Sequence, residues 1–153
     1  MVDEAIVKPE GEPVMQYTVM LQNRAGSLGS MVRMVRNAKI EIIGLSVQDS
    51  KDATMVRMVS TDPGALSCLF MERGISFTTS ELVVVALKET GEGLGRCLDT
   101  LMAAETNVDF AYGLLVHPQR QSLLALHLED HLFGREVLTR AGFKVFYQED
   151  LSR

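Results

Sequence analysis

The sequence predicts an α+β fold in which one βαββαβ unit occurs twice. Strand-like alternation and helix-like spacing of apolar residues follow one another in the same order in both halves, and the turn signals fall at matching places. Corresponding positions lie 66 residues apart before the hairpins, as Leu21 and Leu87 do, and 68 apart after them, as Gly74 and Gly142 do. We therefore predict ferredoxin-like repeats over 14–80 and 81–153, each an antiparallel sheet with helices on one face, after a flexible leader over 1–13.

The first copy is predicted to hold four strands and two helices. Apolar residues alternate in the strands and recur at helical spacing in the helices, while Asp62-Pro63 is typical of a helix start and Gly74 of a helix end. The predicted elements are strand 15–21, helix 28–36, strand 40–47, strand 54–60, a helix from Asp62 to Gly74, and a strand from Ile75 onward.

The second copy repeats this order after a junction that lacks linker composition. Gly, Pro and Asn are absent between Gly74 and Gly91, so we expect the last strand of the first copy to run straight into the first strand of the second. The two copies should then be rigidly coupled. Its predicted elements are strand 82–87, a polar turn at 89–93, helix 94–101, strand 108–116, turn 117–121, strand 122–128, a helix capped by Asp130 and ended by Gly142, and strand 143–147.

Two of the predicted strands, 82–87 and 123–128, are apolar at nearly every position. Helices on one face of an antiparallel sheet cover only half of such a strand, so the other face needs a second cover. The second copy or a second chain can supply it, and we expect a homodimer.

Composition excludes several classes of protein. The 153 residues carry a net charge of -5 and a pI near 5.2, which disfavours binding to nucleic acids or anionic membranes. Residues 1–13 lack a signal-peptide core, and no apolar run reaches membrane-spanning length, so we expect a cytoplasmic protein. Cys68 and Cys97 belong to no metal-binding spacing and indicate buried free thiols.

The stretch from Gln22 to Leu28 is the most informative part of the chain. It joins a strand to a helix, with Gly26 supplying backbone freedom and Ser27 a good N-cap. Backbone N–H groups at such a helix start can hold a carboxylate or phosphate. The alternative is that Gly26 and Ser27 only turn and cap the chain.

With this loop, the duplicated unit resembles the ACT domain, a small-molecule regulatory module of amino-acid metabolism, over about residues 14–151. Loops of that family typically read D/N-R/K-P-G-x-L. The first loop matches with Asn23, Arg24, Gly26, Ser27 and Leu28, whereas Ala25 replaces the proline. The second loop is a poorer copy, with Glu92 at the family glycine; it consists of Glu89, Thr90, Gly91, Glu92, Gly93 and Leu94. Residues 107–112 and 143–151 resemble the family's second and closing strands.

The resemblance implies a non-catalytic regulator that binds an amino acid, without cofactor or metal, at the loops after the first strands near an interface between ACT units. Backbone N–H groups of 25–28, with Asn23 and Arg24, would hold the α-carboxylate, although Arg24 can equally be a surface arginine. Glu89 and Glu92 would repel a carboxylate; they either bind the ammonium group or belong to a structural relic. Tyr112 either lines the pocket or packs at the interface. The alternative function is a regulatory subunit that acts in trans on a biosynthetic enzyme.

Other signals are weaker. His127 and His131 are four residues apart but fall on a strand and a helix start, which disfavours a shared metal ion. His117 is better explained as a turn residue, and Ser27 has no nucleophile-elbow motif. RNA-recognition domains share the βαββαβ order, but the candidate strands 54–60 and 122–127 lack stacking aromatic residues. The methionines are interpreted as core filler or adaptable interface, with a soft ligand surface as the alternative.

Overall fold

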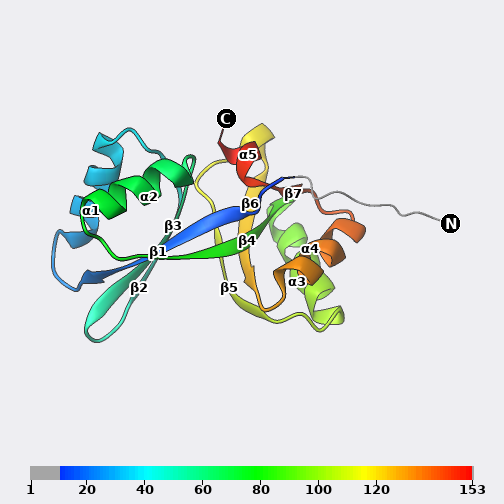
Figure 1. The fold of residues 1–153 in the computed structure, drawn as a ribbon. Coiled ribbons are helices and arrows are strands. Elements are labelled where there is room, and N and C mark those ends of the chain that lie inside the picture. Colours follow the sequence, from blue (N-terminus) through cyan, green and yellow to red (C-terminus); the bar gives the residue numbers. More distant parts are fainter. Residues whose placement is uncertain (1–10, 153) are drawn as a thin grey trace.

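The structure is a computed structural model that describes residues 11–152 (Figure 1). Most of the leader predicted over 1–13 lies outside these residues. The strands are β1 (Val14–Gln22), β2 (Ile42–Asp49), β3 (Ala53–Ser60), β4 (Thr78–Leu87), β5 (Val108–Gly113), β6 (Ser122–Leu128) and β7 (Val145–Phe146). The helices are α1 (Ser27–Asn37), α2 (Pro63–Glu72), α3 (Thr90–Ala103), α4 (His131–Arg140) and α5 (Gln148–Leu151), with a 3-10 turn, η1 (Pro118–Arg120). No helix in the described part of the chain is long and apolar enough to span a membrane.

Strand β4 belongs to both repeats. Its first half, from Thr78 to Leu82, pairs with β1, and its second half, from Val83 to Leu87, pairs with β6. Strand β7 pairs with β4 at Val84 and Val85. All strands therefore form one antiparallel sheet in the order β2-β3-β1-β4-β6-β5, and the predicted α+β fold and the continuous strand between the copies are confirmed.

The sheet curls until its two edge strands meet. Gly44 of β2 forms an antiparallel bridge with Leu114, just after β5, and the Leu115 N–H donates to the Ile43 carbonyl at 2.7 Å. A Cβ atom at Gly44 would lie 2.6 Å from Leu114 Cδ2, so a side chain there would force the Leu114 side chain to shift. The four long helices lie outside the curled sheet, α1 and α2 at one end and α3 and α4 at the other (Figure 1).

The curled sheet encloses a core shared by both repeats. Its inner-face residues include Val14, Ile43 and Val59 from the first repeat and Leu123 and Ala125 from the second, all at most 3% exposed. The outer faces form two further cores, one under α1 and α2 and one under α3 and α4. The second face of the apolar strands is thus covered by the other repeat, and it no longer supplies an argument for a dimer.

Helix starts show where local rules hold and where they fail. Asp62 and Asp130 cap α2 and α4 as predicted, accepting hydrogen bonds from Ala65 N at 3.0 Å and Phe133 N at 3.1 Å. The prediction for Ser27 is wrong: Gly26 is the N-cap, with φ at +88°, and Ser27 is the first helical residue. The chain reverses here through a left-handed glycine rather than through a side-chain cap.

Two other predicted segments also differ. The turn predicted at 89–93 is instead the first turn of α3, which begins at Thr90. The closing strand predicted over 143–147 is reduced to Val145–Phe146, because Tyr147 N–H donates to Asp150 Oδ2 at 2.8 Å and starts the short helix α5. Helix α5 returns to the first repeat, where the Gln148 side chain accepts from Met15 N at 3.0 Å and donates to the Ser60 carbonyl at 3.0 Å.

Candidate functional site

A large hollow lies beside the first loop. It has a volume of about 1210 Å³ and is bounded by the β1–α1 loop, the first half of α1 and the segment that leads into β4. We call it the first pocket. Its lining comprises Thr18, Val19, Met20, Leu21, Gln22, Arg24, Ala25, Gly26, Ser27, Ser30, Met31, Met34, Met55, Arg73, Gly74, Ile75, Ser76, Phe77 and Thr78.

The pocket exists because β4 leaves β1 early. The two strands pair only from Val14 to Thr18, opposite Leu82 to Thr78. Beyond that point, the segment 74–77 diverges, and Val19–Gln22 has a neighbouring strand, β3, on one side only. Alternate residues of this stretch therefore direct N–H and C=O groups toward the pocket instead of a strand partner.

The first loop is a tight turn whose backbone donors remain available. Arg24 N donates to the Gln22 carbonyl at 2.9 Å, and Ser27 N to the Arg24 carbonyl at 3.3 Å. The N–H groups of Gly26, Leu28 and Gly29 have no acceptor among residues 11–152. Unpaired donors at the start of an eleven-residue helix favour an anion.

Gly26 is required for its backbone conformation. A Cβ atom there would meet nothing within 4 Å, so space alone would allow a side chain. The constraint is its φ of +88°, because this left-handed conformation costs about 1–2 kcal/mol in residues that carry a side chain. The backbone freedom expected of Gly26 from the sequence is therefore sufficient to explain this glycine.

A second pocket occupies the equivalent place in the second repeat. It is smaller, about 360 Å³, and is lined by Glu89, Glu92 and Gly93 of the predicted second loop together with Lys88, Arg96 and Phe143, among others. The Arg96 guanidinium lies 4.1 Å from the centre of the Phe143 ring and donates to the Ala141 carbonyl at 3.2 Å. Arg96 and Phe143 thus occupy space in the second repeat where the first repeat has the smaller side chains of Ser30 and Ile75, their respective counterparts in register.

Not every residue predicted for the two loops lines a pocket. In the first loop, Asn23 is exposed outside the lining and Leu28 packs against the outer core under α1. In the second loop, Thr90, Gly91 and Leu94 lie outside the lining, and the Thr90 hydroxyl is 2.9 Å from Ser122 Oγ. The structure therefore gathers four residues of the first loop, from Arg24 to Ser27, at the first pocket.

Tyr112 lies between the repeats, away from both pockets. Its hydroxyl donates to Gln16 Oε1 at 2.7 Å, and Gln16 Nε2 donates to Thr18 Oγ1 at 3.3 Å. Burial raises the pKa of the Tyr112 hydroxyl above its usual value, against the opposing effect of the Arg57 guanidinium. Because Thr18 lines the first pocket, this hydrogen-bond chain connects the pocket to the second repeat.

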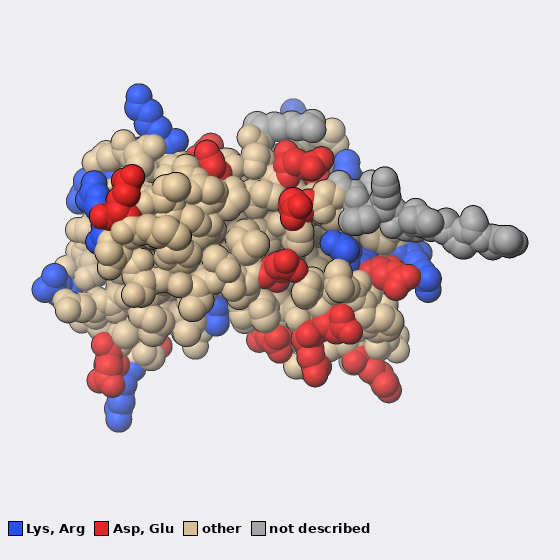
Figure 2. All heavy atoms as spheres, viewed as in Figure 1, with Lys and Arg blue, Asp and Glu red and all other residues tan. Residues whose placement is uncertain are grey.

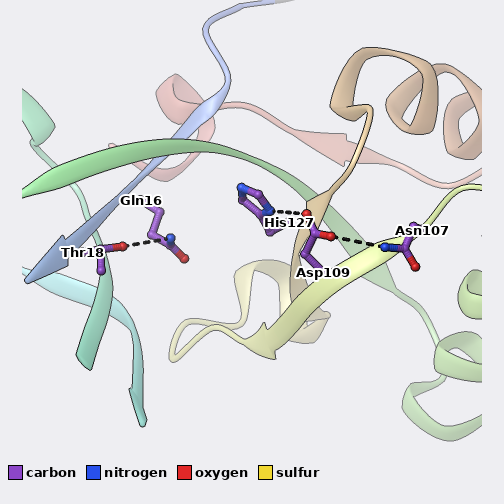
Figure 3. Close-up of polar contacts among 5 residues, drawn as sticks. All are labelled: Gln16, Thr18, Asn107, Asp109 and His127. Atoms are coloured by element: carbon purple, nitrogen blue, oxygen red, sulfur yellow. Dashed lines mark hydrogen bonds and ion pairs between the residues drawn. The ribbon is translucent and has the colours of Figure 1, made fainter. Parts of the chain in front are cut away.

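Figure 3 shows the Gln16–Thr18 pair of β1 and, in the second repeat, a polar group made by Asp109 of β5, His127 of β6 and Asn107 just before β5. His127 Nδ1 lies 2.9 Å from Asp109 Oδ2, and the Asn107 side chain donates to Asp109 Oδ1 at 3.3 Å. His131 instead pairs with Glu81 at 2.6 Å. The two histidines thus have different carboxylate partners, and no cluster of three metal-ligating side chains occurs within residues 11–152.

Several pocket residues were not predicted from the sequence. Arg73 and the segment 74–78 come from the end of the first repeat, about fifty residues after the loop, and no local pattern marks them. Four of the methionines, Met20, Met31, Met34 and Met55, line the first pocket, and Met31 is also buried in the outer core under α1. Met58 is fully buried in the core.

Charge also separates the two repeats. Residues 14–80 contain seven Lys and Arg against five Asp and Glu, whereas residues 81–152 contain six against eleven. Figure 2 shows acidic side chains gathered over the end of the molecule that holds α3 and α4. An anion is therefore attracted more to the first repeat than to the second.

The fold and the pocket together define a duplicated ferredoxin-like protein with a ligand-sized hollow at a strand-to-helix turn. A family model described as "ACT domain pair" matches residues 13–153. The chain belongs to this family.

Solved structures share the fold at low sequence identity. A protein from Bacteroides thetaiotaomicron superposes with a TM-score of 0.83 at 16% identity, over 92% of this chain and 96% of that one. The ligand-free regulatory subunit of aspartate kinase from Thermus thermophilus gives 0.58 at 9%, over 87% and 95%, and aspartokinase alpha and beta subunits give 0.57 at 14%, over 83% and 90%. A search of curated protein sequences found no match.

Proposed function

We propose that this chain is a non-catalytic, cytoplasmic regulatory protein that binds an amino acid in the first pocket. The observation that carries the proposal is that the ACT-like loop from Arg24 to Ser27 lines a pocket of about 1210 Å³. Unpaired N–H groups at the start of α1 and the Arg24 guanidinium suit an α-carboxylate. The similarity of the fold to that of the aspartate kinase regulatory subunit supports a regulatory role.

The test is a thermal-shift screen of the full chain against the standard amino acids at millimolar concentration, followed by titration calorimetry of those that stabilise it. Binding to the folded state raises the melting temperature. If no amino acid does so, the proposal fails. A binding amino acid should bind at least tenfold more weakly to Arg24→Ala, because a charge-assisted hydrogen bond is lost.

Arg33→Ala is the matched control for this variant. Arg33 is an exposed arginine of α1 that does not line the first pocket, so its removal changes the net charge equally. Ligand affinity should remain within about twofold of the original, since only distant screened charge is lost. Equal losses in the two variants would indicate general charge attraction and would remove Arg24 from the site.

A second candidate function is regulation in trans through protein contact, and α3 favours it. Leu94, Leu98 and Met102 are spaced four residues apart on this helix and are 38%, 40% and 70% exposed. An exposed apolar stripe of this kind is typical of a docking surface. Co-purification from native cells tests it: recovery of a biosynthetic enzyme that Leu98→Asp releases would support this function, and recovery of only a homodimer would oppose it.

A further inference from the structure

The charged residues that line the first pocket are all positive. Arg24 and Arg73 are its only charged lining residues, and neither Asp nor Glu lines it. Both arginines are exposed, and neither forms an ion pair with another residue in 11–152. The second pocket, in contrast, mixes Glu89 and Glu92 with three cationic side chains. The first pocket therefore offers partners for a carboxylate but none for a cationic side chain.

The floor of the first pocket is apolar. Val19 and Met31 are 1% and 5% exposed, and Met34, Met55 and Phe77 are half-buried. The ring of Phe77 is fixed by its neighbours, with centroid distances of 5.3 Å to Tyr17 and 5.7 Å to Phe70. The methionines opposite can change rotamer to fit a ligand. The pocket thus combines one rigid aromatic wall with an adaptable thioether wall.

These features discriminate among amino acids by side chain. A lysine or arginine side chain would lie beside two arginines without a carboxylate partner. An acidic side chain that entered the floor would lose its hydration without gaining a donor, because Arg24 and Arg73 are exposed and are not part of the floor. An apolar side chain gains by leaving water for this floor. The α-ammonium group needs no acidic residue, because the unpaired edge of β1 at Val19–Gln22 offers backbone carbonyls.

We propose that the ligand is an amino acid with an uncharged, apolar side chain of about leucine to phenylalanine size. Its carboxylate is held by Arg24 and the loop N–H groups, and its side chain lies on Met31, Met34 and Phe77. This inference rests on the proposed function, since it assigns the ligand class of the same pocket. It makes Met34 and Phe77 the residues that determine specificity.

Titration calorimetry of the full chain with six probes tests the ligand class. L-leucine, L-methionine and L-phenylalanine should bind at least a hundredfold more tightly than L-lysine, L-glutamate and L-threonine. If L-lysine, L-glutamate or L-threonine binds as tightly as the apolar set, the ligand class is overturned while the proposed function stands. If none of the standard amino acids binds, the proposed function itself fails, so the two failures are distinguishable.

A substitution at Met34 tests the floor directly. Met34→Glu places a carboxylate among the apolar lining and should weaken L-leucine binding at least tenfold while improving the affinity of L-lysine relative to L-leucine. Thr100→Glu, at the position of α3 that corresponds to Met34, is the matched control and should change neither. Circular dichroism verifies that the variant is folded. If Met34→Glu unfolds, the milder Met34→Thr replaces it, and it should lower the affinity for L-leucine several-fold. Unchanged selectivity in the folded Met34 variant overturns the proposal.

Discussion

The first and second pockets occupy equivalent places in the two repeats, yet the first has a volume of about 1210 Å³ and the second only about 360 Å³. Three pairs of residues account for the difference: Gly26 against Glu92, Ser30 against Arg96, and Ile75 against Phe143. Glu92 lies in a regular helical turn, where the first repeat has a left-handed glycine, and Arg96 packs on Phe143. The two repeats thus share their strand order and the aspartate caps of α2 and α4, whereas a few side chains and the start of the first helix determine the size of the hollow.

The largest effect is expected when the first loop is made like the second. Gly26→Glu should weaken ligand binding at least a hundredfold, because it adds a negative charge beside the carboxylate site and disfavours the left-handed turn by about 1–2 kcal/mol. Calorimetry and chemical denaturation measure the two effects. Gly26→Asn, which tolerates this backbone conformation, should retain binding within a few-fold. Full affinity in the glutamate variant would show that the loops do not differ in the way described.

Alkaline pH should affect the second repeat through Cys97, which occupies the position that Met31 holds in the first. Burial raises the pKa of the Cys97 thiol to about 11 from 9.0. The unfolded thiol ionises first, so the contribution of this thiol to the free energy of unfolding is constant below pH 9 and falls between pH 9 and 11, by about 3 kcal/mol in all. Denaturant titrations at several pH values measure it.

The Tyr112 hydroxyl, whose pKa is also raised, adds to this loss above about pH 10. Cys97→Ala should remove the thiol's part of the pH dependence, whereas Cys68→Ala, at an exposed thiol of α2, should leave it unchanged. Identical alkaline profiles for the two variants would contradict a special role for the buried thiol.

Opening the second pocket is expected to have a smaller effect. Arg96→Ser removes the contact with the Phe143 ring and should lower the free energy of unfolding by about 1 kcal/mol. Binding should remain at one ligand per chain, because Glu89 and Glu92 still repel a carboxylate. Calorimetric stoichiometry measures this, with Arg33→Ser as the control. A stoichiometry of two would show that Arg96 alone keeps the second pocket empty.

The smallest difference is expected at the caps that the repeats share. Asp62→Ala and Asp130→Ala should each destabilise the fold by about 1 kcal/mol, because each carboxylate accepts a hydrogen bond from the third residue of its helix. Denaturation midpoints should therefore shift by the same amount in both variants. A large difference between the two shifts would mean that the two caps, although geometrically equivalent, do not stabilise the two repeats equally.

Sequence periodicity was sufficient where structure is local. The alternation around Tyr17 and Val19, the proline after Asp62 and the lack of breakers before Gly91 predicted strands, caps and the shared strand correctly. The second loop was mispredicted because Gly91 and Gly93 are typical of a turn, whereas the helix starts before them. Glycine lowers helix propensity without excluding a helix that tertiary packing stabilises.

The pocket was only half predictable. Its loop has a recognisable sequence, but Arg73 and Phe77 reach it through the path of the chain after α2. The contact between Gly44 and Leu114 could not be predicted from the sequence either, because a single glycine in a strand does not indicate which distant residue will pack against it. They meet only because the sheet, in the order β2-β3-β1-β4-β6-β5, curls until its edges form a bridge.

The bridge between Gly44 and Leu114 closes a ring of strands, and this ring has a consequence for folding. Neither repeat has a complete interior of its own, because Val14 and Val59 are buried against Leu123 and Ala125 of the other half. We predict that the two repeats unfold in a single transition and that residues 11–80 alone would not form a stable domain. Calorimetry of the full chain that resolved two separate transitions would contradict this. Although two copies of one unit are visible in the sequence, cooperativity should make them one folding unit.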